Sequence, residues 1–190
     1  MDLFTSSLAY IKWINSIEKK NNPNFDSTWF GGFYCNDDDL DVFSPNIKWI
    51  REQKNWKRIA YIGAIGTSLR PVHFIAIFID VNAKEIFSYD SQHSEEFDPL
   101  NNLKNRLPEY KFINNKYCNQ FKYSLCGFFA LNFLEKMIRA QDLHKCFSHF
   151  NVEKNRDAEI FEYQKKSVIT NNINVKLINI FLEQWKLKKP

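Results

Sequence analysis

The chain has 190 residues, of which 44% are hydrophobic and 25% charged, and its formal net charge at pH 7 is +4. This length and composition predict one domain, residues 1–190, with a sizeable core, and the mild positive charge does not by itself argue for a nucleic-acid partner. No segment approaches the roughly 18 uninterrupted apolar residues of a transmembrane helix, and the N-terminus lacks the pattern of a secretory signal. We therefore expect an intracellular protein that is not secreted, contacts no membrane and keeps its cysteines reduced.

The N-terminal part of the chain gives two signals. Residues Leu3 to Ile17 are predicted to form an amphipathic helix, because leucine and isoleucine recur on one face. Asp37 to Asp39 form an acidic run, for which we expect a solvated loop or a helix cap. A calcium loop is excluded there, because the glycine and glutamate that it needs at later positions are absent.

Strands are predicted in the middle of the chain from short apolar runs. They are Arg58–Ile65, Val72–Asp80 and Lys84–Asp90, with a further candidate at Tyr110–Asn114. The second run is apolar on both faces, which is typical of a central strand. A short turn around Asn82 and Ala83 joins the second and third runs into a hairpin.

The run from Cys126 to Arg139 has the pattern of a helix. Its polar residues form one narrow stripe, made of Asn132, Glu135, Lys136 and Arg139. A helix with so little polar surface is buried on most sides. Residues after about 140 mix helix-like pieces with polar loops, and the pattern assigns them no role.

The predicted hairpin brings His73 and Asp90 to one place. If Asn82 and Ala83 form the turn, Asp90 lies opposite Ile75, and His73 is two residues before Ile75 on the same face. His73 and Asp90 are then diagonal neighbours at the open end of the hairpin, roughly 7–8 Å apart at the backbone. At that separation an aspartate carboxylate can hold an imidazole ring.

Cys126 supplies a nucleophile for this pair. It begins the buried helix, where the partial positive charge of the helix N-terminus favours a thiolate, and Gly127 leaves room for a substrate backbone. A thiolate beside an imidazole that a carboxylate orients is the arrangement for nucleophilic acyl transfer. Gln120, six residues upstream, can offer its side-chain NH₂ to the oxyanion, and the backbone N–H of Cys126 can be a second donor.

Each of these residues alone more often has a structural role. Taken together and in this order, they favour a catalytic site. The other concentration of candidate ligands is His144, Cys146 and His149, which is a poor zinc pattern because no matching fourth ligand occurs. We therefore expect no metal and no cofactor.

The order His73, Asp90, Gln120, Cys126 resembles that of the adenain and ubiquitin-like-protease (Ulp-type) cysteine peptidases. The strand "VHFIAIFID" is similar to that group's His-Trp strand, with Phe74 in place of the usual Trp. "IFSYDSQ" is similar to the strand that ends in the catalytic acid, and "CGFFALNFL" to the adenain helix that opens Cys-Gly-aromatic. The resemblance covers about Trp29 to Ile138. It implies an α+β papain-like fold, in which a mixed β-sheet packs against a central helix that carries the nucleophile.

The resemblance also implies an activity. The chain would be a thiol-dependent endopeptidase that cleaves after Gly-Gly or Gly-X sites. "SLCG" stands where the desumoylating branch has Asp-Cys-Gly, and the chain is small with no long N-terminal regulatory region, which favours the viral branch. Its composition also fits an AT-rich virophage or protist-virus genome. The expected substrate is then a capsid or virion protein, cut by a monomer in the virion, the host cytoplasm or a viral factory, with DNA or a peptide as activator.

Two alternatives stay open. The same chemistry could remove ubiquitin-like modifiers, in which case the protein would be a deubiquitinase- or desumoylase-like isopeptidase. The scaffold could also serve as a binding module without catalysis. The four residues together argue against this last alternative. Cys118, two residues before Gln120, is interpreted as structural rather than redox-active.

Overall fold

A five-stranded mixed sheet forms the centre of the computed structural model, which describes residues 28–35, 56–67, 70–93, 100–121 and 125–171. The strand order is β1-β2-β3-β4-β5. The strands are β1 (Thr28–Cys35), β2 (Arg58–Thr67), β3 (Arg70–Asp80), β4 (Glu85–Tyr89) and β5 (Lys111–Asn114). The pairs β2–β3 and β3–β4 are antiparallel, whereas β1 and β5 join the two edges in parallel. The predicted mixed sheet is confirmed.

The hairpin of β3 and β4 has the register that the sequence predicts. Asp80 pairs with Glu85 and Ala76 with Tyr89. The connection is longer than Asn82 and Ala83 alone, because the strands end at Asp80 and Glu85. The Asp80 carboxylate accepts hydrogen bonds from the backbone N–H groups of Asn82 and Ala83 at 3.0 and 2.9 Å, which is an aspartate-stabilised turn.

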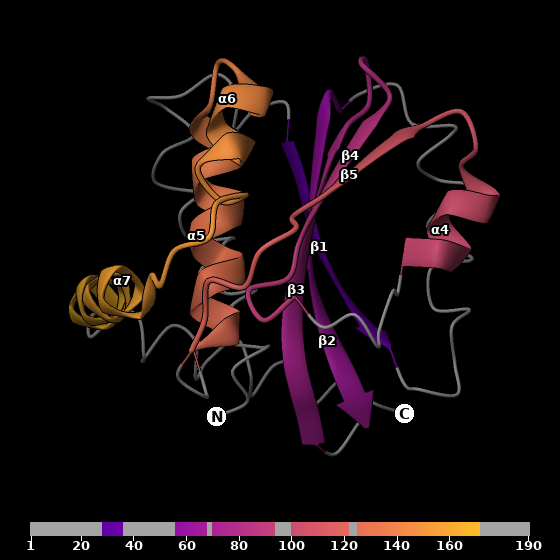
Figure 1. Ribbon diagram of the computed structural model, residues 1–190. Helices are drawn as coiled ribbons and strands as arrows, with labels where there is room; N and C mark the ends of the chain where they lie inside the picture. Colours follow the sequence, from indigo (N-terminus) through magenta and orange to yellow (C-terminus); the bar gives the residue numbers. More distant parts are fainter. Residues whose placement is uncertain (1–27, 36–55, 68–69, 94–99, 122–124, 172–190) are drawn as a thin grey trace.

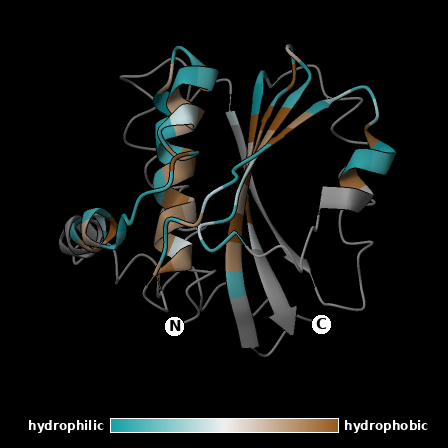
Figure 2. Ribbon diagram, in the orientation of Figure 1, coloured by the Kyte–Doolittle hydropathy of each residue, from teal (hydrophilic) through white to brown (hydrophobic). Residues whose placement is uncertain are grey.

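Helices cover both faces of the sheet (Figure 1). On one face lies α5 (Cys126–Arg139), with the bounds that the sequence predicts, and on the other lies α4 (Leu100–Arg106). Successive residues of β3 alternate between two apolar clusters, so Phe74 packs below α5 and Ile75 on the opposite side. This double burial explains why β3 is apolar on both faces. Figure 2 shows the same pattern as brown segments along α5 and the central strands.

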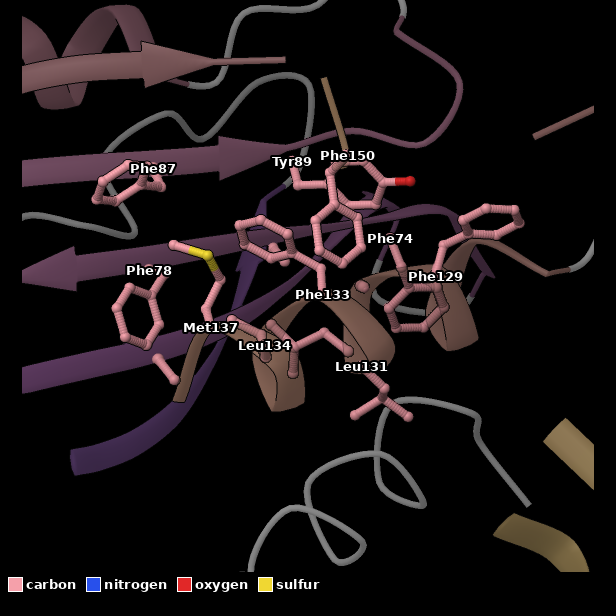
Figure 3. Packing of buried hydrophobic residues seen from close by; sticks show 14 of the residues in the cluster. Phe74, Phe78, Phe87, Tyr89, Phe129, Leu131, Phe133, Leu134, Met137 and Phe150 are labelled. Carbon is pink, nitrogen blue, oxygen red and sulfur yellow. The ribbon is translucent and has the colours of Figure 1, made fainter. Parts of the chain in front are cut away.

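Aromatic rings fill the layer between the sheet and α5 (Figure 3). Phe133 of α5 stacks on Tyr89 of β4 with 5.0 Å between ring centroids. Phe150 packs edge-on against Phe133, also at 5.0 Å. Phe150 follows α6 (Leu143–Ser148) and precedes α7 (Asp157–Asn171), so the C-terminal segment is anchored in the same core as the strands.

The C-terminal end of α5 is tied to the sheet by Arg58 of β2. Its guanidinium donates to the backbone oxygens of Ile138 at 2.7 Å and Ala140 at 3.1 Å. These carbonyls are among the groups that a helix end leaves without an intrahelical partner. The contact fixes one end of α5, while Cys126 lies at the other end.

Several expectations need correction or lie outside the described residues. Asn132 is buried, with 6% of its surface exposed, so the polar stripe of α5 is narrower than expected. β1 and α4 were not predicted. The expected helix Leu3–Ile17 and the acidic run Asp37–Asp39 fall outside the described residues. In the described part of the chain, no helix is long and apolar enough to cross a membrane.

Candidate active site

His73 and Asp90 form the first contact of the candidate site. Both lie beyond Ala76 and Tyr89, the last paired residues of the β3–β4 ladder. The Nε2 atom of His73 is 2.6 Å from Oδ1 of Asp90, and because a carboxylate only accepts, Nε2–H is the donor. The two side chains are 11% and 22% exposed, so this hydrogen bond is largely shielded from water.

Cys126 lies close enough to His73 to influence the pKa of the imidazole. It is the first residue of α5 and is 8% exposed. Burial lowers the pKa of His73, but the hydrogen bond to Asp90 and the interaction with the Cys126 sulfur outweigh it and raise this pKa to about 9. Nδ1 of His73 is buried and forms no hydrogen bond of standard geometry with any described residue. The sulfur therefore interacts with the imidazole without a well-formed hydrogen bond, a looseness that is usual before substrate binds.

The N-terminus of α5 has no side-chain cap. Leu125 is the residue before the helix, and its side chain has no hydrogen-bonding group. Its backbone oxygen accepts from the N–H groups of Phe128 and Phe129 at 2.9 and 3.0 Å. The N–H groups that begin a helix have no intrahelical acceptor and carry its positive partial charge. The thiol of Cys126 and its own N–H are therefore at a position that favours negative charge.

Gln120 is held against the residue that follows Asp90. It is 4% exposed, and its Oε1 accepts a hydrogen bond from Oγ of Ser91 at 2.6 Å. Its backbone N–H donates to the backbone oxygen of Ser91 at 2.9 Å. Ser91 thus engages the oxygen of this amide, whereas the Nε2 atom carries its two N–H donors. The four residues singled out in the sequence thus lie in one region. Gln120 contacts Ser91, which directly follows Asp90 in the sequence. Asp90 contacts His73, and Cys126 influences the pKa of His73.

Asn115 holds the backbone of Asp90 and was not anticipated from the sequence. Its Oδ1 accepts from the N–H of Asp90 at 2.9 Å, and its Nδ2 donates to the Asp90 carbonyl at 2.7 Å. The N–H of Gln92 donates to Oδ1 of Asp90 at 2.9 Å, the same oxygen that contacts His73. The asparagine's place directly after a strand is the one sequence signal that could have drawn attention to it.

The remaining sequence candidates lie elsewhere or contact other groups. Sγ of Cys118 is 3.1 Å from the backbone oxygen of Gln120, as a half-buried thiol in the same loop. Nε2 of His144 is 2.8 Å from Oε2 of Glu85, far along the hairpin from the site. Among the described residues no three His, Cys, Asp or Glu side chains are grouped as metal ligands. Burial raises the pKa of the Cys146 thiol.

Comparisons with known proteins give structural matches alone. No family model and no curated protein matches the chain. The crystal structure of an ASFV protease matches 80% of this chain with a TM-score of 0.56 at 14% identity, and the chain spans 61% of that protease's length. A selenomethionine form of the same protease matches 86% of the chain at TM-score 0.54 and 14% identity, covering 65% of that protein. A de-sumoylating protease matches 96% of the chain and 82% of its own length, at TM-score 0.53 and 13% identity. With the order and packing of the described elements, these matches give the identification that the sequence pattern predicts: the chain has the α+β fold of the adenain and Ulp-type cysteine proteases.

Proposed function

We propose that the protein is a cysteine endopeptidase in which Cys126, His73 and Asp90 form a catalytic triad. The observation that carries the proposal is the 2.6 Å contact between His73 Nε2 and Asp90 Oδ1, on a histidine whose other side interacts with a thiol at a helix N-terminus. A pKa of about 9 keeps His73 protonated at neutral pH, which is the charge state that stabilises a neighbouring thiolate. The protease fold of the matched structures supports the same assignment.

Each residue then has a defined part in the reaction. The Cys126 thiolate attacks the carbonyl carbon of the scissile bond while its proton resides on Nδ1 of His73. Negative charge develops on the carbonyl oxygen, which accepts hydrogen bonds from the Gln120 NH₂ and the Cys126 N–H. His73 gives its proton to the leaving amine, and a water whose proton returns to His73 then releases the acyl group. Asp90 keeps the ring oriented through Nε2 in every step.

The proposed substrate is a polypeptide cut after Gly-Gly or Gly-X, in a capsid or other virion protein. Glycine has no side chain, so a substrate chain with glycine at these positions can lie flat in a narrow cleft. The fold match to an ASFV protease favours a viral setting, the virion or the host cytoplasm or a viral factory. We propose residues 1–190 as one catalytic domain that acts as a monomer, with DNA or a peptide from the virion as its activator.

A second candidate is an isopeptidase that acts on ubiquitin-like modifiers. This chain covers 82% of the de-sumoylating protease, compared with 61% of the ASFV protease. A larger share of the de-sumoylating protease therefore has a counterpart in this chain. Cleavage of a modifier fusion but not of a capsid protein would favour this candidate. A capsid protein cut at Gly-Gly or Gly-X sites, with modifier fusions left intact, would favour the first.

The proposal is tested by covalent labelling with a peptide vinyl sulfone that ends in Gly-Gly, followed by intact mass. We expect one adduct on the wild type, none on Cys126→Ala and much slower labelling of His73→Ala. Cys146→Ala removes a half-buried thiol outside the site and should label like the wild type. Equal labelling of wild type and Cys126→Ala would identify a merely accessible thiol and end the assignment. If the wild type is inert, the experiment is repeated with DNA and with virion extract to supply an activator.

A further inference from the structure

The backbone around Gln120 is attached to a C-terminal segment that the sequence left without a role. Asn119 is fully buried, at 0% exposure. Its Nδ2 donates to the backbone oxygens of Val152 at 2.8 Å and Lys154 at 3.2 Å. Its Oδ1 accepts from the hydroxyl of Tyr89 at 3.0 Å. One side chain therefore joins the end of β4 to residues 152–154.

The main chain of Asn119 makes the same bridge. Its N–H donates to the oxygen of Ser91 at 2.8 Å, and its oxygen accepts from the N–H of Arg156 at 3.0 Å. Every hydrogen-bonding group of Asn119 thus has a partner. Tyr89 and Ser91 lie on one side of Asn119, and the C-terminal segment supplies the partners on the other side. A buried amide with its groups satisfied in this way defines one backbone position, because any other position would leave polar atoms without partners.

Phe121, on the other side of Gln120, is tied to the same segment. Its backbone N–H contacts both carboxylate oxygens of Asp157, at 3.3 and 3.2 Å. The Phe121 side chain is 62% exposed, so little side-chain packing holds this residue in place. Asp157 is 5% exposed and begins α7, and its own N–H donates to Oδ1 of Asn155 at 2.9 Å. Gln120 is thus flanked by two residues that both depend on the C-terminal segment.

The segment is itself fixed to the core. The guanidinium of Arg156 lies 4.5 Å from the ring centroid of Phe150, and Phe150 packs on Phe133 of α5. The same guanidinium donates to Glu159 at 2.6 and 3.0 Å, although Arg156 is only 4% exposed. Residues 150–156 therefore connect the backbone around Gln120 to the hydrophobic core.

We infer that residues 150–160 brace the oxyanion loop, and that Asn119 and Asp157 are positioning residues for Gln120. This inference rests on the proposed function, since it assigns the brace the task of aiming the Gln120 NH₂. Loss of the brace loosens the backbone on both sides of Gln120, whose hydrogen bonds to Ser91 remain, and it leaves the contact between His73 and Asp90 in place. Nucleophilicity and oxyanion stabilisation should then respond differently to the same substitution.

The first test variant is Asn119→Asp, which keeps the acceptor for Tyr89 and removes both donors to Val152 and Lys154. We expect faster hydrogen exchange at the amides of residues 119–121. We expect kcat to fall about 10–100-fold with little change in KM, as for loss of an oxyanion donor. Binding of a peptide aldehyde ending in glycinal should weaken in parallel, because its thiol adduct carries an oxygen at the oxyanion position. Alkylation of Cys126 by iodoacetamide needs no oxyanion donor and should stay within about twofold of wild type.

A second variant protects the test against misfolding. Asp157→Ala removes the tether of Phe121 and should give the same split between aldehyde affinity and alkylation rate. Asn114→Asp, outside the brace, is the matched control, because Oδ1 of Asn114 accepts from Oγ of Ser88 at 2.7 Å and an aspartate keeps that bond.

The outcomes separate the inference from the proposed function. Unchanged hydrogen exchange in folded Asn119→Asp and Asp157→Ala would overturn the brace. Faster exchange with unchanged kcat and aldehyde affinity would overturn its positioning role. A wild type that neither binds the aldehyde nor cleaves a peptide, with or without activator, would overturn the proposed function first and this role with it. Parallel losses of alkylation and aldehyde binding would show general damage to the site and would also contradict the inference.

Discussion

His73 and Gln92 donate to one and the same oxygen of Asp90, at 2.6 and 2.9 Å. The backbone N–H of Gln92 therefore fixes which carboxylate oxygen faces the imidazole. If Asp90 is replaced by asparagine, the Gln92 N–H selects the amide oxygen for this position, and that oxygen can still accept from Nε2–H of His73. The two hydrogen bonds to this oxygen thus predict that asparagine at position 90 is tolerated better than alanine.

We expect Asp90→Ala to lower kcat/KM by about 10²–10⁴-fold, because the ring loses both its orientation and its counter-charge. We expect Asp90→Asn to lose about tenfold, since the orientation is kept and only the charge is lost. The measurement is kcat/KM on one fluorogenic Gly-Gly peptide, with far-UV circular dichroism as a control for folding. Equal losses in the two variants would contradict the role of Gln92 in selecting the oxygen.

The raised pKa of His73 predicts an alkaline limit on activity. In the folded protein this pKa is about 9, above the ordinary value of 6.5, so the imidazolium is favoured by folding. The proton is present in both states below 6.5, and the stabilisation that it gives is full there and is lost as pH rises through about 9. We expect kcat/KM to fall on the alkaline side near pH 9, and the limit to move to lower pH in Asp90→Asn.

The measurement is a pH profile of kcat/KM from pH 6 to 10.5, paired with iodoacetamide alkylation over the same range. Alkylation reports the thiolate alone and should not fall at high pH, which separates loss of the imidazolium from loss of the nucleophile. An alkaline limit that does not move in Asp90→Asn would assign it to a group other than His73.

The sequence predicted the parts of the site that depend on regular structure. The β3–β4 register, which brings His73 beside Asp90, follows from one short turn and the period of two in a strand. The bounds of α5, and so the place of Cys126 at its N-terminus, follow from helical periodicity. These inferences needed only local geometry.

The sequence did not predict the residues that support the site from a distance. Asn115 and Asn119 act through two or three side-chain hydrogen bonds to segments 25 to 35 residues away, and no periodicity marks such contacts. β1 was missed because its Gly31–Gly32 pair is atypical of strands, and α4 because seven residues are too few to show a helical period. Asn132 was misplaced because a polar residue on a mostly apolar helix is usually assigned to the solvent side.

Asn115 is expected to matter for activity through Asp90. Replacing it with aspartate keeps the acceptor for the Asp90 N–H but loses the donor to the Asp90 carbonyl, and it adds a negative charge beside the backbone oxygen. We expect kcat/KM to fall about tenfold or more, with part of the loss coming from a displaced His73. Steady-state kinetics on the same peptide measure the effect.

The neighbouring asparagine gives a matched control for Asn115. Oδ1 of Asn114 accepts from Oγ of Ser88 at 2.7 Å, and Asn114→Asp preserves that acceptor. Activity of Asn114→Asp should therefore stay close to wild type. If Asn115→Asp were as active as Asn114→Asp, the amide of Asn115 would have no part in holding Asp90.

Arg58 should contribute to stability rather than to catalysis. Its two hydrogen bonds to the backbone oxygens of Ile138 and Ala140 tie the C-terminal end of α5 to the sheet, at the opposite end of the helix from Cys126. Removing the guanidinium leaves partly buried carbonyls without a donor, which costs about 1–3 kcal/mol in the free energy of unfolding. We therefore expect Arg58→Ala to lower the urea midpoint without a change in the slope of the transition.

The matched variant for Arg58 is Arg58→Lys, which keeps the positive charge near the negative end of the helix dipole but cannot reach both carbonyls. Its free energy of unfolding should lie between those of wild type and Arg58→Ala. At temperatures where all three proteins are folded, their kcat values should agree, because the contact lies far along α5 from the thiol. A midpoint for Arg58→Ala equal to that of wild type would show that the tie is not needed to hold α5 on the sheet. A fall in kcat with no change in the urea midpoint would mean that the C-terminal end of α5 is coupled to Cys126 through the helix.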